Sequence, residues 1–289
     1  MESTIKIVKP YLSLIRPKHW IKNLLIFIPI IYAHNLNKLD LLKSTILCFL
    51  IFCLISSAVY VINDIVDLDN DRLHPVKNMR PIASGQIKIV NAVIIAIFLI
   101  IISFLAAIFL FEDYFVFLFV MLYLLTNIVY SLYLKHYTII DCFCIAAGFV
   151  FRVYAGGAAS NSRVSEWLFL TMMVTSLCMA FAKRRGEIIQ QTNIMTTRKV
   201  LLSYDLQFLN GTIYVCASLS IIFYSLWAMN NVSIMIYTVP FVIYILYRYL
   251  LIIHGEKSEG DPTLVIFGNA SLLITIIIFG ILSIIMLYM

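Results

Sequence analysis

Long apolar runs separated by short polar segments dominate the chain. The runs are continuously apolar and lack the strict alternation of a β-strand that has one wet face. Most of them approach 20 residues, the length that an α-helix needs to cross the hydrocarbon core of a bilayer. The pattern predicts an all-α, polytopic integral membrane helical bundle with nine transmembrane helices, at residues 20–34, 41–62, 90–111, 114–134, 138–159, 165–182, 206–228, 232–252 and 264–288.

Composition agrees with this pattern. Hydrophobic residues make up 62% of the 289 positions, charged residues only 12%, and the mean hydropathy is +0.98. A soluble domain of this length could not bury so much apolar surface. We therefore expect a single transmembrane domain over residues 1–289, with a short cytoplasmic lead-in at residues 1–19. We expect no nucleic-acid partner, and the oligomeric state is left open, a homo-oligomer included.

The basic residues predict an orientation. With nine spans and a cytoplasmic N-terminus, 17 of the 21 lysines and arginines fall on the cytoplasmic side. Cytoplasmic loops of membrane proteins carry such an excess of Lys and Arg. We expect a multi-pass protein of the inner (cytoplasmic) membrane whose C-terminus lies outside. The large polar connections would then face the cytoplasm.

An unusual concentration of acid follows the second run, in the stretch "NDIVDLDND". Asp64, Asp67 and Asp71 are spaced i, i+3, i+7, which on a continuous helix places them within an arc of about 60°. Asn63 lies about 40° beyond this arc and Asp69 points to the other side. Carboxylates on one face repel unless a cation neutralises them, and Mg²⁺ takes one or two carboxylates together with phosphate oxygens.

A basic run follows the acids at once, with Arg72, His74, Lys77 and Arg80. Acids for a metal beside bases for phosphate suit a diphosphate–Mg²⁺ ligand. The competing interpretation is a solvated helix end with scattered charges.

Three further ionisable residues lie in or beside the apolar runs. Lys135 ends the fourth run, Asp141 begins the fifth and Arg152 lies inside it. An arginine within a membrane is costly and usually faces a polar interior. Because Asp141 is eleven residues back on nearly the same helix face, a structural pair with Arg152 is the alternative to a functional role.

The stretch "NDIVDLDNDRLHPVKNMRPIASG" resembles the first aspartate-rich motif of the UbiA superfamily of intramembrane prenyltransferases. The resemblance extends from "RPKHWIKN" at residues 16–23 to "EGDP" at residues 259–262. It implies a nine-helix bundle that uses Mg²⁺ and a diphosphate substrate.

The connection after the sixth run departs from the usual pattern. Aromatic prenyltransferases of this superfamily carry a second aspartate-rich motif there, whereas this chain has "AKRRGE" with Lys183, Arg184 and a single acid, Glu187. Base replaces acid, so we expect an additional anionic group on a substrate instead of a second Mg²⁺ site. With "RPKHWIKNLLIFIP", "YSLYLKH" and "FRVYAGG", this segment resembles the decaprenyl-phosphate phosphoribosyltransferase (5-phosphoribosyl-1-pyrophosphate:polyprenyl-phosphate) branch.

That branch resemblance implies a reaction. Phosphoribosyl pyrophosphate would donate 5-phosphoribose to a polyprenyl phosphate, giving polyprenyl-phosphoryl-5-phosphoribose, a cell-wall precursor in some relatives, and pyrophosphate. The catalytic residues would be Asn63, Asp64, Asp67 and Asp71, of which the three aspartates would hold Mg²⁺. The substrate-binding residues would be Lys22, Asn23, Arg72, Lys77, Arg80, Lys135, Asp141, Arg152, Lys183 and Arg184.

Two other functions stay open at this point. One is the transfer of a polyprenyl group from its diphosphate to an aromatic acceptor. The other is transport, although the acids gather at one membrane face and transporters bind their substrates near the midplane. We expect Arg185, Arg198 and Lys199 only to set the topology.

Overall fold

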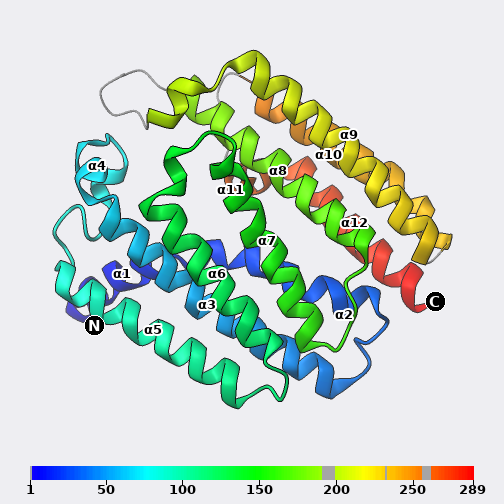
Figure 1. Cartoon of the computed structure of the whole chain (residues 1–289), viewed down its shortest axis with the longest axis horizontal. Coiled ribbons are helices and arrows are strands. Elements are labelled where there is room, and N and C mark those ends of the chain that lie inside the picture. The colour runs from blue at the N-terminus through cyan, green and yellow to red at the C-terminus, as the bar shows by residue number, and fades with distance from the viewer. Residues whose placement is uncertain (1, 191–198, 232, 256–261) are drawn as a thin grey trace. The chain divides into compact units, whose positions relative to one another are not determined.

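The computed structural model describes residues 2–190, 199–231, 233–255 and 262–289, and this part of the chain is helical with no strand. The α-helices are α1 (Glu2–Ile15), α2 (Ile28–Tyr32), α3 (Leu39–Val66), α4 (Leu68–Leu73), α5 (Ile89–Phe109), α6 (Phe115–Leu132), α7 (Ile140–Ala159), α8 (Glu166–Ile189), α9 (Leu206–Asn231), α10 (Val239–His254), α11 (Pro262–Gly268) and α12 (Ala270–Tyr288). The 3₁₀ helices are η1 (Pro17–Phe27), η2 (Lys77–Met79), η3 (Leu134–His136), η5 (Lys199–Ser203) and η6 (Ser233–Thr238). Figure 1 shows the α-helices in chain order.

The prediction of an all-α membrane bundle is confirmed. Within the described residues, eight helices are long and apolar enough to cross a bilayer, and they coincide with the second to ninth predicted runs. The first predicted run, 20–34, instead forms η1 followed by the five-residue α2. Pro29 lies at the start of α2 and has no backbone N–H, so a regular α-helix cannot continue through it without losing a hydrogen bond.

The chain divides into two compact units. Unit one comprises Met1–Lys135 and Phe151–Arg163, and unit two comprises His136–Val150 and Val164–Met289. Helix α7 therefore contributes its first half to unit two and its second half to unit one. The expectation of a single domain over residues 1–289 stays a prediction.

Helix α3 is the centre of unit one. It packs against α5, α6 and η1, and Figure 1 shows α3, α5 and α6 side by side. The buried side of α5 is a stripe of small residues, namely Ala92, Ala96, Ser103 and Ala107. Small side chains let helix backbones approach closely in a membrane, where packing takes the place of the hydrophobic effect.

In unit two, α8 and α9 make the most extensive helix pair (Figure 1). Their buried side chains include Cys178 on α8 and Leu209 and Ile213 on α9. Polar groups in this interface pair internally, as where Thr175 Oγ1 contacts Ser220 Oγ at 3.1 Å. Such pairing satisfies groups that lipid cannot solvate.

A glycine permits a close backbone approach in unit one. A Cβ on Gly156 of α7 would overlap the backbone carbonyl of Ile26 at the end of η1. A backbone carbonyl cannot move away as a flexible side chain can. Only glycine therefore fits at this position.

We predict that Gly156→Ala lowers the thermal unfolding midpoint in detergent, because overpacking of this kind costs about 1–3 kcal/mol. The matched control is Gly280→Ala in α12, where an added Cβ would meet nothing within 4 Å. This control should keep or raise the midpoint, since alanine is favoured over glycine in a helix by about 0.5–1 kcal/mol. Equal midpoints for the Gly156 variant and the native protein would contradict the close approach.

Candidate functional site

The acidic cluster, which we define as Asp64, Asp67 and Asp71, lies where α3 gives way to α4. Helix α3 ends at Val66 and α4 begins at Leu68, so the helix is interrupted at Asp67, whose φ is −90° and ψ is 8°. The prediction of one uninterrupted helix face through all three acids is therefore wrong. Aspartate competes with the backbone for hydrogen bonds and favours helix ends, which explains an interruption in this acid-rich stretch.

Two members of the cluster share a cation. Arg80 Nη1 lies 3.1 Å from Asp64 Oδ1 and 2.6 Å from Asp71 Oδ2. Asp64, only 2% exposed, also pairs with Arg16. Asp64 and Asp71 thus face one guanidinium despite the interruption between them, as the spacing predicted.

The third member points to a different partner. Asp67 Oδ1 accepts a hydrogen bond from Lys135 Nζ at 2.6 Å, and the Lys135 side chain is only 9% exposed. Nearby, Ser131 of α6 donates a hydrogen bond to Asn63 Oδ1. Unit one therefore brings the predicted Asn63, Asp67 and Lys135 close to one another through α3, α6 and η3.

Arg16 is a member of this site that is not among the residues predicted from the sequence. It lies in the left-handed region, with φ 51°, immediately before η1, and its guanidinium lies 5.2 Å from the centroid of the Tyr60 ring. Burial lowers the pKa of Arg16 and the Asp64 carboxylate opposes that change, so the group stays a cation. In the sequence, Arg16 is one of several basic residues in the lead-in. Its partner Asp64 becomes apparent only in the tertiary structure.

The basic run after the cluster does not act as one group. Arg80 joins the cluster, but Arg72 is exposed and lies 3.9 Å from the exposed Asp69. Lys77 is half-buried, and its backbone N–H donates to His74 Nδ1 at 3.3 Å. The spacing correctly separated Asp69 from the cluster, but the structure does not bring Arg72 to it.

A second polar network of unit one lies among apolar side chains. Arg152 Nε donates to Asn23 Oδ1 at 2.7 Å, Arg152 Nη2 donates to Tyr123 Oη at 3.1 Å, and the guanidinium lies 4.6 Å from the Tyr123 ring centroid. Asn23 also donates to Ser56 Oγ at 3.3 Å, while the adjacent Lys22 is half-buried. These contacts tie η1 to α3, α6 and α7.

The alternative pairing of Arg152 with Asp141 is wrong. Eleven residues of helix separate them by about 16 Å along the axis, so sharing a face does not bring them into contact. The partners of Asp141 lie in unit two, where Arg184 Nε contacts its Oδ2 at 2.5 Å and Tyr204 donates to its Oδ1 at 2.7 Å. Asp141 and Arg184 are both fully buried.

Arg184 therefore holds a buried ionic network together. Its Nη1 also lies 2.5 Å from Glu187 Oε2, one turn further along α8. Burial raises the pKa of the Tyr204 phenol, as does its hydrogen bond to Asp141, so this hydroxyl acts as a donor. Its oxygen also accepts from the backbone N–H of Ile139, a β-branched residue held at φ 72°. This network fixes the turn that precedes α7.

The two residues next to Arg184 in the sequence differ from it in burial and in their contacts. Lys183 is half-buried, whereas Arg185 is buried and donates to Asn210 Oδ1 at 2.7 Å and to the Ile253 carbonyl at 2.5 Å. The expectation that Arg185 only sets the topology is wrong, because its guanidinium joins α8 to α9 and α10. The similar expectation for Arg198, and for the side chain of Lys199, lies outside the described residues.

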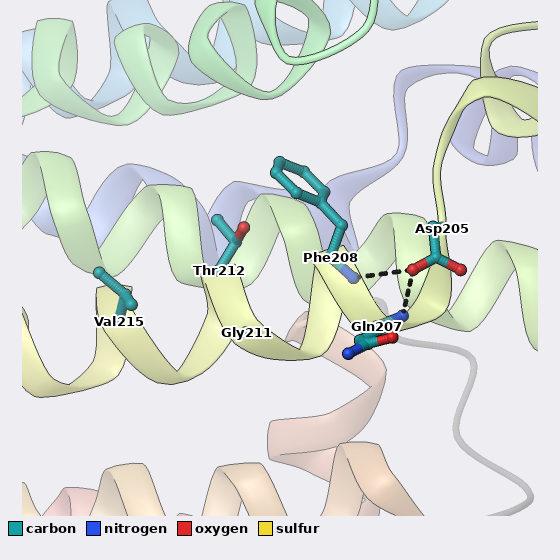
Figure 2. A pocket seen from close by; sticks show the side chains of 6 residues that line it. All are labelled: Asp205, Gln207, Phe208, Gly211, Thr212 and Val215. Atoms are coloured by element: carbon teal, nitrogen blue, oxygen red, sulfur yellow. Dashed lines mark hydrogen bonds between the residues drawn. The ribbon is translucent and has the colours of Figure 1, made fainter.

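A surface hollow of about 520 Å³ lies along the first turns of α9 in unit two. Figure 2 shows the side chains that line it, from Asp205 to Val215. Asp205 Oδ2 accepts the backbone N–H groups of Gln207 at 3.0 Å and Phe208 at 3.2 Å, which caps the helix. None of the predicted site residues lines this hollow, and its acid is engaged in capping.

The donor set of the acidic cluster suits a hard divalent cation, since carboxylate and amide oxygens are the ligands that Mg²⁺ prefers. Within the described residues, however, no three His, Cys, Asp or Glu side chains are gathered in a metal-binding geometry. Each carboxylate of the cluster instead has a basic partner. The chemistry fits the ion, and binding it requires some of these ion pairs to open.

Comparison with known proteins finds relatives from two mycobacterial species that share one name. The chain is 30% identical over 258 residues to the decaprenyl-phosphate phosphoribosyltransferase of Mycobacterium tuberculosis, covering 86% of this chain and 84% of that protein. It is 31% identical over 230 residues to the protein of the same name from Mycolicibacterium smegmatis, covering 78% of this chain and 72% of that protein.

The fold is similar to that of solved structures. A UbiA homologue from Archaeoglobus fulgidus bound to GPP and Mg²⁺ superposes with a TM-score of 0.76, at 22% identity, over 95% of this chain and 99% of that one. At this level of identity the likeness concerns the fold alone. The profile of the UbiA prenyltransferase family matches residues 24–270, and the chain belongs to that family.

Proposed function

We propose that this protein transfers 5-phosphoribose from phosphoribosyl pyrophosphate to a polyprenyl phosphate, with Mg²⁺, at the cytoplasmic face of the inner membrane. The mycobacterial relatives described above, at 30% and 31% identity, are named for this activity. One structural observation carries the proposal. Unit one holds three carboxylates in ion pairs with Arg16, Arg80 and Lys135, at the end of a helix long enough to span a bilayer.

This arrangement suits a substrate that carries both a metal and phosphates. Phosphoribosyl pyrophosphate has a diphosphate and a separate 5-phosphate, and the lipid acceptor carries a further phosphate. Arginine recognises phosphate with paired N–H donors and lysine with a compact charge. When a phosphate enters, the three cations can exchange carboxylate oxygens for phosphate oxygens, which allows the carboxylates to bind a metal.

The reaction forms one bond and breaks one. An oxygen of the lipid phosphate forms a bond to C1 of the ribose, and the bond from C1 to the pyrophosphate oxygen breaks, with its electron pair leaving on pyrophosphate. The nucleophile is already ionised, so no strong protein base is required. The protein has to orient the two anions and stabilise the charge that grows on the departing pyrophosphate.

Asp64 and Asp67 are the proposed ligands of Mg²⁺, with Asn63 as a ligand or an orienting group and Asp71 as a further metal or ribose contact. A bound Mg²⁺ would neutralise charge on the diphosphate. Arg16, Arg80 and Lys135 are the proposed phosphate contacts in the cluster. Additional proposed substrate contacts are Lys22, Asn23, Arg72, Lys77, Arg152 and Lys183.

For Asp141 and Arg184 in unit two, we propose a positioning role in place of substrate binding. Asp141 and Arg184 are fully buried and occupy each other, so we propose that they position the cytoplasmic end of α8. Lys183, half-buried beside them, is the better candidate for a phosphate contact. The proposed N-terminus is cytoplasmic and the proposed C-terminus is outside, in keeping with the basic residues.

The donor is tested by incubating the purified protein with polyprenyl phosphate, Mg²⁺ and radiolabelled phosphoribosyl pyrophosphate. We expect a radiolabelled lipid product, and we expect mild acid to release the label from that lipid. The matched reaction supplies a labelled prenyl diphosphate and an aromatic acceptor, 4-hydroxybenzoate, and should give no product. Product only in the second reaction would favour aromatic prenyl transfer and overturn the proposal.

We predict that Asp67→Asn lowers kcat for this transfer by about 100-fold or more, because the amide keeps the shape of the side chain but loses the charge that binds the metal. Mg²⁺ should raise the thermal midpoint of the native protein and not that of the variant, which measures binding independently of turnover.

The matched control is Asp69→Asn, whose carboxylate is 97% exposed and lies outside the cluster. This variant should keep the native rate and the native response to Mg²⁺. A fully active Asp67→Asn protein, or an equal loss in both variants, would remove the metal assignment.

Two adjacent residues of α8 should respond differently to alanine. Lys183→Ala should lower kcat/KM for phosphoribosyl pyrophosphate by about 30-fold or more while the thermal midpoint changes little, because the loss of a charge-assisted phosphate contact affects the bound substrate. Arg184→Ala should instead destabilise the fold by about 3–5 kcal/mol, since it removes the cation beside the fully buried Asp141 carboxylate.

The control for both is Lys88→Ala, which removes an exposed cation at the start of α5. It should change neither the rate nor the midpoint. A folded Arg184→Ala protein that loses only its affinity for the donor would reverse the assignment of these two residues.

A further inference from the structure

Unit two carries an arginine in a membrane span that the proposed reaction does not use. Arg248 lies in the span Ser233–His254, six residues before its end, which is about 9 Å along the helix axis. The cost of a charge inside a membrane falls when a long side chain can reach the level of the lipid head groups, as it can from this depth.

The guanidinium of Arg248 is fixed by one edge only. Its Nε donates to Ser271 Oγ at 3.0 Å, Ser271 donates to Asn269 Oδ1 at 2.8 Å, and Asn269 caps α12 by accepting the backbone N–H of Leu272 at 3.3 Å. This chain of hydrogen bonds orients the guanidinium at the N-terminal end of α12, where the helix dipole adds positive potential. Within the described residues, Nη1 and Nη2 have no protein partner.

The surface around this guanidinium is hollowed. Arg248 lines a hollow of about 380 Å³ along one face of α10, and its other lining residues are Pro240, Ile243, Tyr244, Tyr247 and Leu251. Tyr247 is 62% exposed and Tyr244 is also exposed, although α10 is a candidate span. Tyrosines favour the interface between lipid and water, where the ring contacts acyl chains and the hydroxyl reaches polar groups.

We propose that this hollow, defined by Tyr244, Tyr247, Arg248 and Leu251, binds the phosphate head group of an anionic phospholipid of the surrounding bilayer. The two free Nη groups match two phosphate oxygens, and Leu251, Ile243 and the tyrosine rings offer an apolar path for an acyl chain. The positive charge of Arg248 favours a head group of net negative charge over a zwitterionic one, so the proposed occupant is an anionic lipid. The proposal does not depend on the orientation of the protein, because both leaflets present phosphates at this depth.

The test is a titration of the purified full-length protein with phosphatidylglycerol, followed by native mass spectrometry, with phosphatidylcholine as the zwitterionic comparison. We expect the native protein to bind phosphatidylglycerol more tightly, and Arg248→Gln to weaken that binding by about tenfold or more in Kd. Arg248→Lys should show an intermediate loss, because the charge remains and the paired donors do not. Ser271→Ala should also weaken binding, because the guanidinium loses its fixed edge.

The matched control is Lys43→Gln, which removes an exposed cation near the start of a different span, α3. This variant should bind phosphatidylglycerol as tightly as the native protein does. A lowered thermal midpoint without lipid will show whether Arg248→Gln disrupts the fold. In that case Arg248→Lys and Ser271→Ala serve as the test of lipid binding. Equal phosphatidylglycerol binding by the native protein and these two variants would overturn the proposal. Displacement of phosphatidylglycerol by an equal amount of polyprenyl phosphate would also overturn it, by assigning the hollow to the acceptor lipid.

Discussion

The structure depends on keeping a counter-charge beside every carboxylate that leaves water. Asp64 is almost fully buried, and an isolated carboxylate in such a place would cost several kcal/mol. Two guanidiniums, from Arg16 and Arg80, meet that demand. They also join the lead-in before η1, the end of α3 and the segment after η2, so the same ion pairs organise the polar end of unit one.

The same constraint supports the proposal that this site serves a phosphate substrate. Cations that neutralise carboxylates in the free protein are already positioned to neutralise phosphates, and the exchange keeps the number of buried charges balanced. Carboxylates with neither a metal nor a basic partner would repel a diphosphate. The three basic residues at the acidic cluster therefore suit a ligand that brings metal and phosphate together. Unit two follows the same rule at Asp141, which is fully buried and paired with Arg184.

The membrane helices were predictable because each is a long apolar run, and the structure places eight of them where the sequence did. The exceptions are local. Pro29 interrupts the first run, and Asn269 caps α12 after α11 has ended at Gly268. A count of apolar residues cannot detect either effect, since both depend on backbone hydrogen bonds.

The candidate site was predictable in part. Spacing alone indicated that Asp64 and Asp71 face one way and that Asp69 does not, because helical periodicity largely survives the interruption at Asp67. Partners could not be predicted, since Arg16 reaches Asp64 across 48 residues and Lys135 reaches Asp67 across 68. Periodicity describes neighbours on one helix, whereas these ion pairs depend on how separate helices pack.

The central claim is that the acidic cluster and its cations bind the metal and diphosphate of phosphoribosyl pyrophosphate. The most direct measurement is a structure of the native protein in lipid nanodiscs with phosphoribosyl pyrophosphate and Mg²⁺. We predict that the ion would contact Asp64 or Asp67, and that phosphate oxygens would lie within hydrogen-bond distance of Arg80 or Lys135. A bound donor that leaves the pairs of Asp64, Asp67 and Asp71 with Arg16, Arg80 and Lys135 intact would contradict the account.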